Sequence, residues 1–289
     1  MRILVTGGSG RVGRWVMREL VEHGHAVVNV DRVPLRVDDN AEGAQAMRAA
    51  QYFNVNLHQV RAISAVMDGC DAVVHLAAFN APLYRPPEET FSHNTQATFC
   101  VLQAAADLGI QRAVIASSVS AIGMAYARHD FAPLYAPVDE AHPFLGQDPY
   151  ALSKEVDEST AAMFHRQTGM TVAAMRFHWV SAPGEAAKMV ERIRDDVQQH
   201  MTNLWGYVDA RDVAQACRLA LEVEGLGFEA FNVLAADTLR EEPTEDLIRT
   251  HLPQVEIRQP MPGNTTAWSI DKARRLLGYS PQHTWRDDA

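Results

Sequence analysis

The sequence predicts an α/β fold in which a doubly wound parallel sheet carries helices on both of its faces. Apolar segments of strand length alternate with amphipathic segments of helix length from Arg2 to Phe177. The first apolar segment runs directly into a glycine-rich turn, which opens a helix at about Arg11. The second apolar segment ends at an acid, Asp31, 18 residues after Gly13. This order of features is typical of the start of a dinucleotide-binding βαβ unit.

The elements can be placed from hydrophobic periodicity and from the glycines and prolines that end helices. We expect strands at residues 3–5, 26–30, 52–57, 71–78, 112–117, 171–177 and 228–234, the last of which could return to the main sheet. We expect helices at residues 11–23, 58–67, 88–108, 150–167, 183–200, 213–223, 244–251 and 270–277. Residues 34–50 are polar and irregular, and residues 123–148 form a long proline-bearing loop, a length that usually serves function.

Composition excludes several classes of protein. The chain has 289 residues, of which 47% are hydrophobic, and a net charge of −10, which predicts a globular core and disfavours a surface for nucleic acids or anionic membranes. We expect neither a membrane span nor a signal peptide. Cys70, Cys100 and Cys217 are far apart and odd in number, which favours buried reduced thiols in a cytoplasmic protein. The twelve histidines lack metal-binding spacing, so no metal is expected.

The three glycines of the first turn each have a physical role. Gly7 permits a tight turn that a residue with a Cβ would resist. Gly10 lets the backbone approach a pyrophosphate, and Gly13 lets the helix pack closely on the strand. The helix N-terminus then offers N–H groups and partial positive charge to a phosphate. We therefore expect the pyrophosphate of a dinucleotide here.

Asp31 bears on the choice of dinucleotide. Its distance from the turn suits a group that bonds the adenosine ribose hydroxyls, although a solvated acid at a strand end would give the same pattern. A carboxylate would repel a 2′-phosphate, so NAD is favoured. Arg11 and Arg32 are close in sequence and could offset that repulsion, which leaves NADP open.

A second set of residues could perform proton transfer. Tyr150 and Lys154 are one helical turn apart and project from the same face. A free tyrosine has a reference pKa of about 10 and is a poor base, but a neighbouring ammonium favours its phenolate. Ser118, at the end of the preceding strand, could bond the substrate oxygen. Together these residues predict acid–base chemistry on an alcohol, with a nicotinamide taking the hydride.

With these motifs in place, the chain resembles the short-chain dehydrogenase/reductase superfamily, in its extended, epimerase/dehydratase-like branch. The motifs that carry the resemblance are Thr6-Gly7-Gly8-Ser9-Gly10-Arg11-Val12-Gly13, His75-Leu76-Ala77-Ala78, the Ser118/Tyr150/Lys154 set and Asp271 to Pro281. The resemblance implies a Rossmann-type domain and a homodimer formed through the helices that begin near Glu88 and Tyr150. It alone implies a role for Asn94. The cofactor-binding residues expected on these grounds are Gly7, Gly10, Arg11, Val12, Gly13, Asp31, Asn56, Leu57, Leu76, Ala77, Ala78, Asn94, Tyr150 and Lys154.

The chain departs from nucleotide-sugar members of the branch after the sixth strand. Trp179 stands where those members have asparagine, and Ala182 where they have glycine. By our alignment Trp205 stands where they often carry an arginine for the diphosphate, and an indole supplies only one neutral donor. Asn56 replaces the usual aspartate near the adenine.

Several side chains could face the substrate. Aromatic faces suit sugar rings, so His178, Trp179, Trp205 and Tyr207 are candidates, with core packing an equal alternative. Asn80 and Ser120 follow two strand ends and are further candidates, although loop capping explains them as well.

These observations favour an NAD-dependent oxidoreductase that acts on a secondary alcohol or hemiacetal of a sugar or sugar acid. A nucleotide-sugar 4-epimerase with retained NAD uses the same residues and stays open, as does a non-catalytic NAD-binding regulator. The cofactor domain is expected at residues 1–177 with about 204–234. A smaller, discontinuous substrate domain is expected at about 178–203 and 235–289.

Overall fold

The computed structural model describes residues 1–34 and 50–287, and its centre is a parallel sheet. Within the described residues the sheet has seven strands in the order β10-β7-β5-β4-β1-β2-β3, and every neighbouring pair is parallel. The strands are β1 (Arg2–Thr6), β2 (Ala26–Val30), β3 (Gln51–Phe53), β4 (Ala72–His75), β5 (Arg112–Ser118), β7 (Thr171–Phe177) and β10 (Phe228–Val233). The predicted α/β fold is confirmed, and the last strand returns to the main sheet beside β7.

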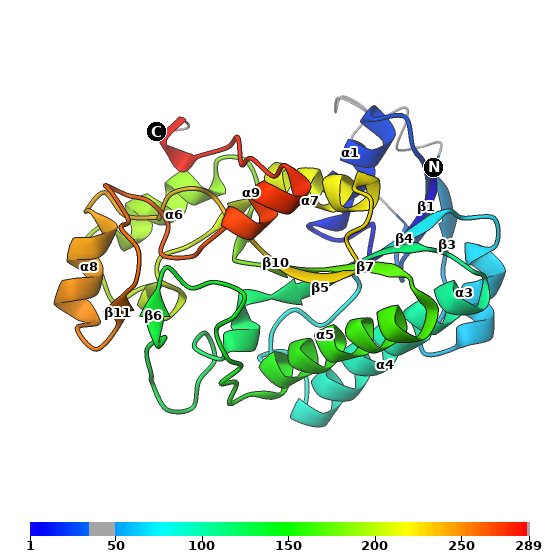
Figure 1. Ribbon diagram of the computed structural model, residues 1–289, viewed down its shortest axis with the longest axis horizontal. Coiled ribbons are helices and arrows are strands. Elements are labelled where there is room, and N and C mark those ends of the chain that lie inside the picture. The colour runs from blue at the N-terminus through cyan, green and yellow to red at the C-terminus, as the bar shows by residue number, and fades with distance from the viewer. Residues whose placement is uncertain (35–49, 288–289) are drawn as a thin grey trace.

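Helices cover both faces of the sheet (Figure 1). One face carries α3 (Val60–Met67), α4 (Pro87–Asp107) and α5 (Pro149–Thr168), and the other carries α1 (Gly13–Glu22), α7 (Ala210–Glu222) and α9 (Asp271–Leu277). Strands covered on both sides are buried at consecutive positions and mostly apolar, instead of alternating between apolar and polar, as β1 and β4 illustrate.

The strand order reverses between β1 and β4. The chain runs outward from β1 to β3 on one side and from β4 to β10 on the other. Helices that leave adjacent strands in opposite directions open a crevice at the carboxyl ends of those strands, and ligands bind there in such sheets. The glycine turn after β1 and residues 76–80 after β4 both lie at this edge.

Three expected elements are shorter than predicted, and polar groups end each of them. The third strand stops at Phe53, and Asn56 Oδ1 accepts a bond from the His58 N–H to form a turn. The fourth stops at His75, after which Thr6 Oγ1 instead of a backbone carbonyl accepts from the Ala77 N–H. The expected helix at 183–200 is only α6 (Glu185–Ile193), and Asp196 accepts from the Gln198 N–H beyond it. Most of the irregular stretch 34–50 lies outside the described residues.

Smaller elements complete the C-terminal half and the long loop. Paired short strands β6 (Tyr135–Ala136) and β11 (Glu256–Ile257) join the loop to the C-terminal region, and β8 (Val180–Ser181) pairs with β9 (Val208–Asp209). Helix α8 (Thr244–His251) lies beside β11 (Figure 1). Among the helices described, none is both long and apolar enough to cross a bilayer. Cys70, Cys100 and Cys217 are buried free thiols.

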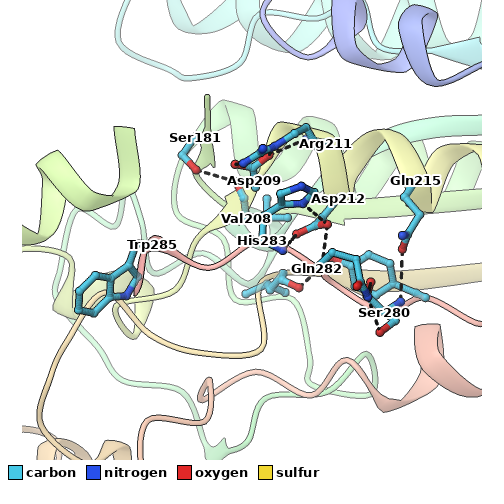
Figure 2. A network of polar contacts seen from close by, with 12 residues as sticks. Ser181, Val208, Asp209, Arg211, Asp212, Gln215, Ser280, Gln282, His283 and Trp285 are labelled. Carbon is cyan, nitrogen blue, oxygen red and sulfur yellow. Dashed lines mark hydrogen bonds and ion pairs between the residues drawn. The ribbon is translucent and has the colours of Figure 1, made fainter. Parts of the chain in front are cut away.

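The C-terminal segment is tied to α7 by a buried carboxylate (Figure 2). Asp212 accepts bonds from the Gln282 N–H at 2.9 Å and the His283 N–H at 3.1 Å, and it contacts His283 Nδ1 at 2.8 Å. Beside it Asp209 caps α7 through the Arg211 N–H. Trp285 is thereby held over a small core with Tyr207 and Leu239.

Candidate active site

The glycine turn is built so closely that side chains have no room at two positions. A Cβ on Gly13 would lie 2.1 Å from the Gly7 carbonyl oxygen, and one on Gly7 would lie 2.8 Å from the Ala77 nitrogen. Gly7 also has a φ of +72°, in the left-handed region that favours glycine. The turn therefore brings bare backbone against the end of β4. Because Val12, the N-cap of α1, has no side-chain cap, the helix end remains available to an anion.

Asp31 clips this turn to the end of β2. Its Oδ2 accepts a bond from the Ser9 N–H at 3.0 Å, and its Oδ1 accepts from the Arg32 N–H at 2.6 Å. It faces a cavity of about 570 Å³ that runs along the carboxyl ends of β1, β2 and β4. The cavity is lined by Gly7, Gly10, Arg11, Val12, Gly13, Val30, Asp31, Arg32, Asn54, Val55, Asn56, Leu57, Leu76, Ala77, Ala78, Phe79, Asn80 and His93. A glycine cradle, an open helix N-terminus and an acid at the far end fit a dinucleotide.

Tyr150 is placed by the start of α5. Asp148 Oδ1 accepts bonds from the Tyr150 and Ala151 N–H groups, both at 2.9 Å, and Pro149 occupies the first turn. Lys154 follows one turn later, with Nζ 5.8 Å from the centre of the Tyr150 ring. Ser118 ends β5, where its Oγ accepts a bond from the Ser120 N–H at 3.0 Å.

Lys154 is buried, and its ammonium group donates hydrogen bonds to two protein acceptors. Its Nζ donates to the Ala116 carbonyl at 2.8 Å and to Asp157 Oδ2 at 3.0 Å, and the two side chains are only 3% and 1% exposed. Burial by itself would lower the pKa of the amine, but Asp157, Tyr150 and Glu158 together outweigh burial and the pKa is raised. The ammonium thus keeps its charge beside Tyr150.

A second cavity of about 550 Å³ adjoins the first and holds these side chains. The two share Arg11, Val12, Leu76, Ala78 and Asn80 as lining residues. The second is lined in addition by Ser118, Ser120, Tyr126, Tyr150, Lys154, Phe177, His178, Trp179, His200 and Asn203, among others. The structure therefore brings Ser118, Tyr150 and Lys154 together in the second cavity, next to the cavity that adjoins the glycine turn.

Three residues expected at the site lie elsewhere. Trp205 is fully buried and its indole donates to the Val197 carbonyl, so it belongs to the core and not to the cavity. Tyr207 is also buried, and its hydroxyl donates to Asp237. Asn94 lies behind the cofactor cavity, where its side chain bonds both backbone groups of Phe79 and the Ser153 hydroxyl. It positions the loop after β4 against α5.

Sequence reasoning missed other lining residues. Tyr126 stacks edge-on against Tyr150 with ring centres 6.2 Å apart, and Tyr84 lies at the cavity wall. Position in the long loop 123–148, expected to be functional, was the available signal for Tyr126. His200 and Asn203 come from an irregular segment that carries no motif.

Comparison with known proteins agrees with the dinucleotide-binding fold described above. The model of the NAD dependent epimerase/dehydratase family matches residues 3–233. The chain is 28% identical over 271 residues to a UDP-glucose 4-epimerase from Streptomyces lividans, covering 91% of this chain and 73% of that protein. It is 27% identical over 176 residues to the uronate dehydrogenase of Pseudomonas syringae pv. tomato, covering 61% and 58%.

Among solved structures, a short-chain dehydrogenase/reductase superfamily protein from Agrobacterium tumefaciens with bound NAD aligns with a TM-score of 0.72. The alignment has 23% identity and covers 99% of this chain and 94% of that one, a likeness that shows the fold. Fold, family model and site together define an enzyme of the extended short-chain dehydrogenase/reductase type. The chain belongs to the NAD dependent epimerase/dehydratase family, and its cofactor is NAD.

Proposed function

We propose that the protein is an NAD-dependent dehydrogenase acting on a secondary alcohol or hemiacetal of a small polyhydroxylated substrate, a sugar or sugar acid. The observation that carries the proposal is that the cavity holding Ser118, Tyr150 and Lys154 adjoins the cavity beside the glycine turn and shares lining residues with it. A substrate-sized space of about 550 Å³ then opens beside a dinucleotide-sized one. Residues 178–203 are proposed to bind the substrate, since Trp179, His200 and Asn203 line that space. Residues 235–289 are proposed to belong to the same part of the chain, although the cavity lining ends at Asn203.

The chain's own residues would divide the chemistry as follows. Gly7, Gly10 and Gly13 would hold the pyrophosphate, and Asp31 the adenosine ribose. When bound, NAD supplies the acceptor or donor of a hydride. Ser118 would bond the substrate oxygen, and Tyr150 would take the proton of the hydroxyl as the carbonyl forms. Lys154, kept charged by Asp157, would stabilise the phenolate and bond the nicotinamide ribose.

The role of Tyr150 has a direct test. Tyr150→Phe keeps the ring and removes the proton-transferring hydroxyl, so we expect turnover to fall about 10²–10⁴-fold, the usual contribution of a general acid–base group. The loss is measured as NADH formation with an identified substrate, with NAD affinity followed in parallel. Full turnover by the variant would remove Tyr150 from the mechanism.

The substrate class is tested by a panel. Free sugars, sugar acids and UDP- and GDP-sugars are offered with NAD, and NADH is followed by absorbance while sugar isomers are followed by chromatography. We expect NADH with free sugars or sugar acids. Interconversion of nucleotide sugars alone would favour the epimerase instead.

We also propose that the protein is a homodimer that pairs through α4 and α5. These helices pack side by side, and their outer faces expose Phe99 (43%) and Leu152 (47%). Light scattering on the purified protein should give twice the chain mass, and Leu152→Asp should shift the mass toward that of one chain. A monomeric wild-type protein would contradict this.

A further inference from the structure

The substrate cavity is walled by aromatic and uncharged groups. Tyr84, Tyr126, Phe177 and Trp179 supply aromatic surface, and Ser120 and Asn203 supply neutral polar groups. Among the described residues, the cationic side chains that line the cavity are Arg11 and Lys154. Whether the site can hold an anionic substrate therefore depends on the partners of these two.

Both cations already have an anionic partner in the protein. Lys154 forms its buried ion pair with Asp157, and its Nζ already donates to Ala116. Arg11 pairs with Glu185 at the start of α6. It also lines the cofactor cavity on the glycine turn, so the alternative partner within its reach is the pyrophosphate of NAD. In both arrangements its charge is compensated.

The two histidines of the wall add no positive charge. His178 Nδ1 accepts a bond from the Trp179 N–H at 2.6 Å, and its Nε2 lies 2.9 Å from the Asn203 carbonyl, which can only accept. These contacts assign the proton to Nε2 and leave the ring neutral. Burial lowers the pKa of His178 to about 4. Burial, and then the charge of Arg192, lower the pKa of His200 as well.

An anionic group in such a cavity would lose water without gaining a counter-charge. A buried charge left without its partner typically costs about 3–5 kcal/mol, which is on the order of 10²–10⁴-fold in binding or kcat/KM. A neutral polyol faces no such penalty, because hydroxyl groups can bond neutral donors and acceptors, and its C–H faces can lie on aromatic rings.

We propose that the substrate is an uncharged sugar, and that the site discriminates against sugar acids and nucleotide diphosphate sugars because the described lining residues include no cation without an anionic partner. The proposal rests on the dehydrogenase function proposed above and narrows its substrate. Carboxylate and diphosphate are rejected for the same electrostatic reason.

The test compares sugars that differ only in charge. kcat/KM with NAD is measured for galactose against galacturonate, for glucose against glucuronate, and for UDP-glucose. We expect at least one neutral sugar to exceed its uronate by about 100-fold or more. A uronate used as well as or better than its neutral partner, with NADH formed, would overturn this proposal and leave the dehydrogenase function standing. Conversion of UDP-sugars without NADH would overturn both.

Two sets of variants separate charge from shape. Val180 lines the cavity, so Val180→Arg should raise kcat/KM for the uronate relative to the neutral sugar, while Val180→Gln, long but uncharged, should not. Arg192 lies near His200 but outside the lining residues. Arg192→Gln should therefore leave the neutral-to-uronate ratio unchanged. A ratio that rises tenfold or more in Arg192→Gln, marking Arg192 as a carboxylate-binding group, would contradict the proposal.

Discussion

The buried ion pair of Arg176 and Glu158 should carry a large share of the stability around the candidate active site. Arg176 lies on β7 and Glu158 on α5, one turn after Lys154. The pair is bidentate, with Nε–Oε1 and Nη2–Oε2 both at 2.8 Å, and the side chains are 3% and 7% exposed. Ser117 on β5 also donates to Glu158 Oε1 at 2.6 Å. The pair therefore joins the catalytic helix to the two strands beside it.

Arg176→Met removes one partner and leaves Glu158 buried without its counter-charge, which should lower the free energy of unfolding by about 3–5 kcal/mol. The double variant Arg176→Met, Glu158→Leu removes both charges, so it should lose less than the single variant. As a control, Arg249→Met breaks the Arg249–Glu245 pair, in which the arginine is 64% exposed, and should lower the free energy of unfolding far less than Arg176→Met does.

Urea unfolding followed by circular dichroism gives the free energy of unfolding of each variant, and the single variant Glu158→Leu, measured alongside, completes the cycle that gives the coupling between Arg176 and Glu158. If Arg176→Met costs no more than Arg249→Met, burial does not set the strength of this pair. If the double variant loses as much as Arg176→Met and Glu158→Leu together, the pair has no coupling. Either result would refute the reasoning.

Three further perturbations have defined outcomes. Gly13→Ala would place a Cβ 2.1 Å from the Gly7 oxygen. This clash should make the free energy of NAD binding, measured by calorimetry, less favourable by about 1–3 kcal/mol. Gly109→Ala, where φ is +71° but nothing lies within 4 Å, should cost about 1 kcal/mol of stability and leave NAD affinity intact. Burial, then Lys154 and His93, lower the pKa of His75 from 6.5 to about 3, so only the unfolded chain binds a proton between these pH values. The contribution of His75 to the free energy of unfolding is complete above pH 6.5 and should fall by about 1.4 kcal/mol per pH unit as the pH drops toward 3. Urea titrations at several pH values should show this slope in the wild-type protein and not in His75→Gln. Asp212→Leu leaves the backbone donors of Gln282 and His283 without their acceptor, and hydrogen exchange in residues 280–287 should accelerate at least tenfold while exchange in β1 is unchanged.

The fold was largely predictable because its signals are local. Each buried strand is a short apolar run, and several helices end at or just before a glycine or proline, as α5 does at Gly169 and α9 at Gly278. Strand ends were less predictable, since β3 and β4 stop where Asn56 and Thr6 side chains take over backbone hydrogen bonds. Such competition depends on which side chain the fold brings within reach.

Site residues could be predicted from their spacing along the chain wherever a single helix or a single turn carries the whole motif. The glycine turn and the Tyr150/Lys154 pair lie within single strand–turn–helix or helix segments, so their geometry follows from local structure. Trp205 shows the limit of this reasoning, because its motif position suggested the substrate side while packing placed it in the core.

By itself, the sequence determined that this chain is a parallel α/β protein with a dinucleotide cradle at its start and a tyrosine–lysine pair on a later helix, because periodicity and glycine placement act over a few residues. Only the tertiary structure decided which distant side chains share a cavity and which of its charges are already paired. Those properties depend on contacts such as Lys154 with Asp157, Arg11 with Glu185 and His178 with Asn203. The last two contacts join segments that are separated in the sequence. All three form only when the chain has folded around the cavity, and together they determine the charge that a substrate meets there.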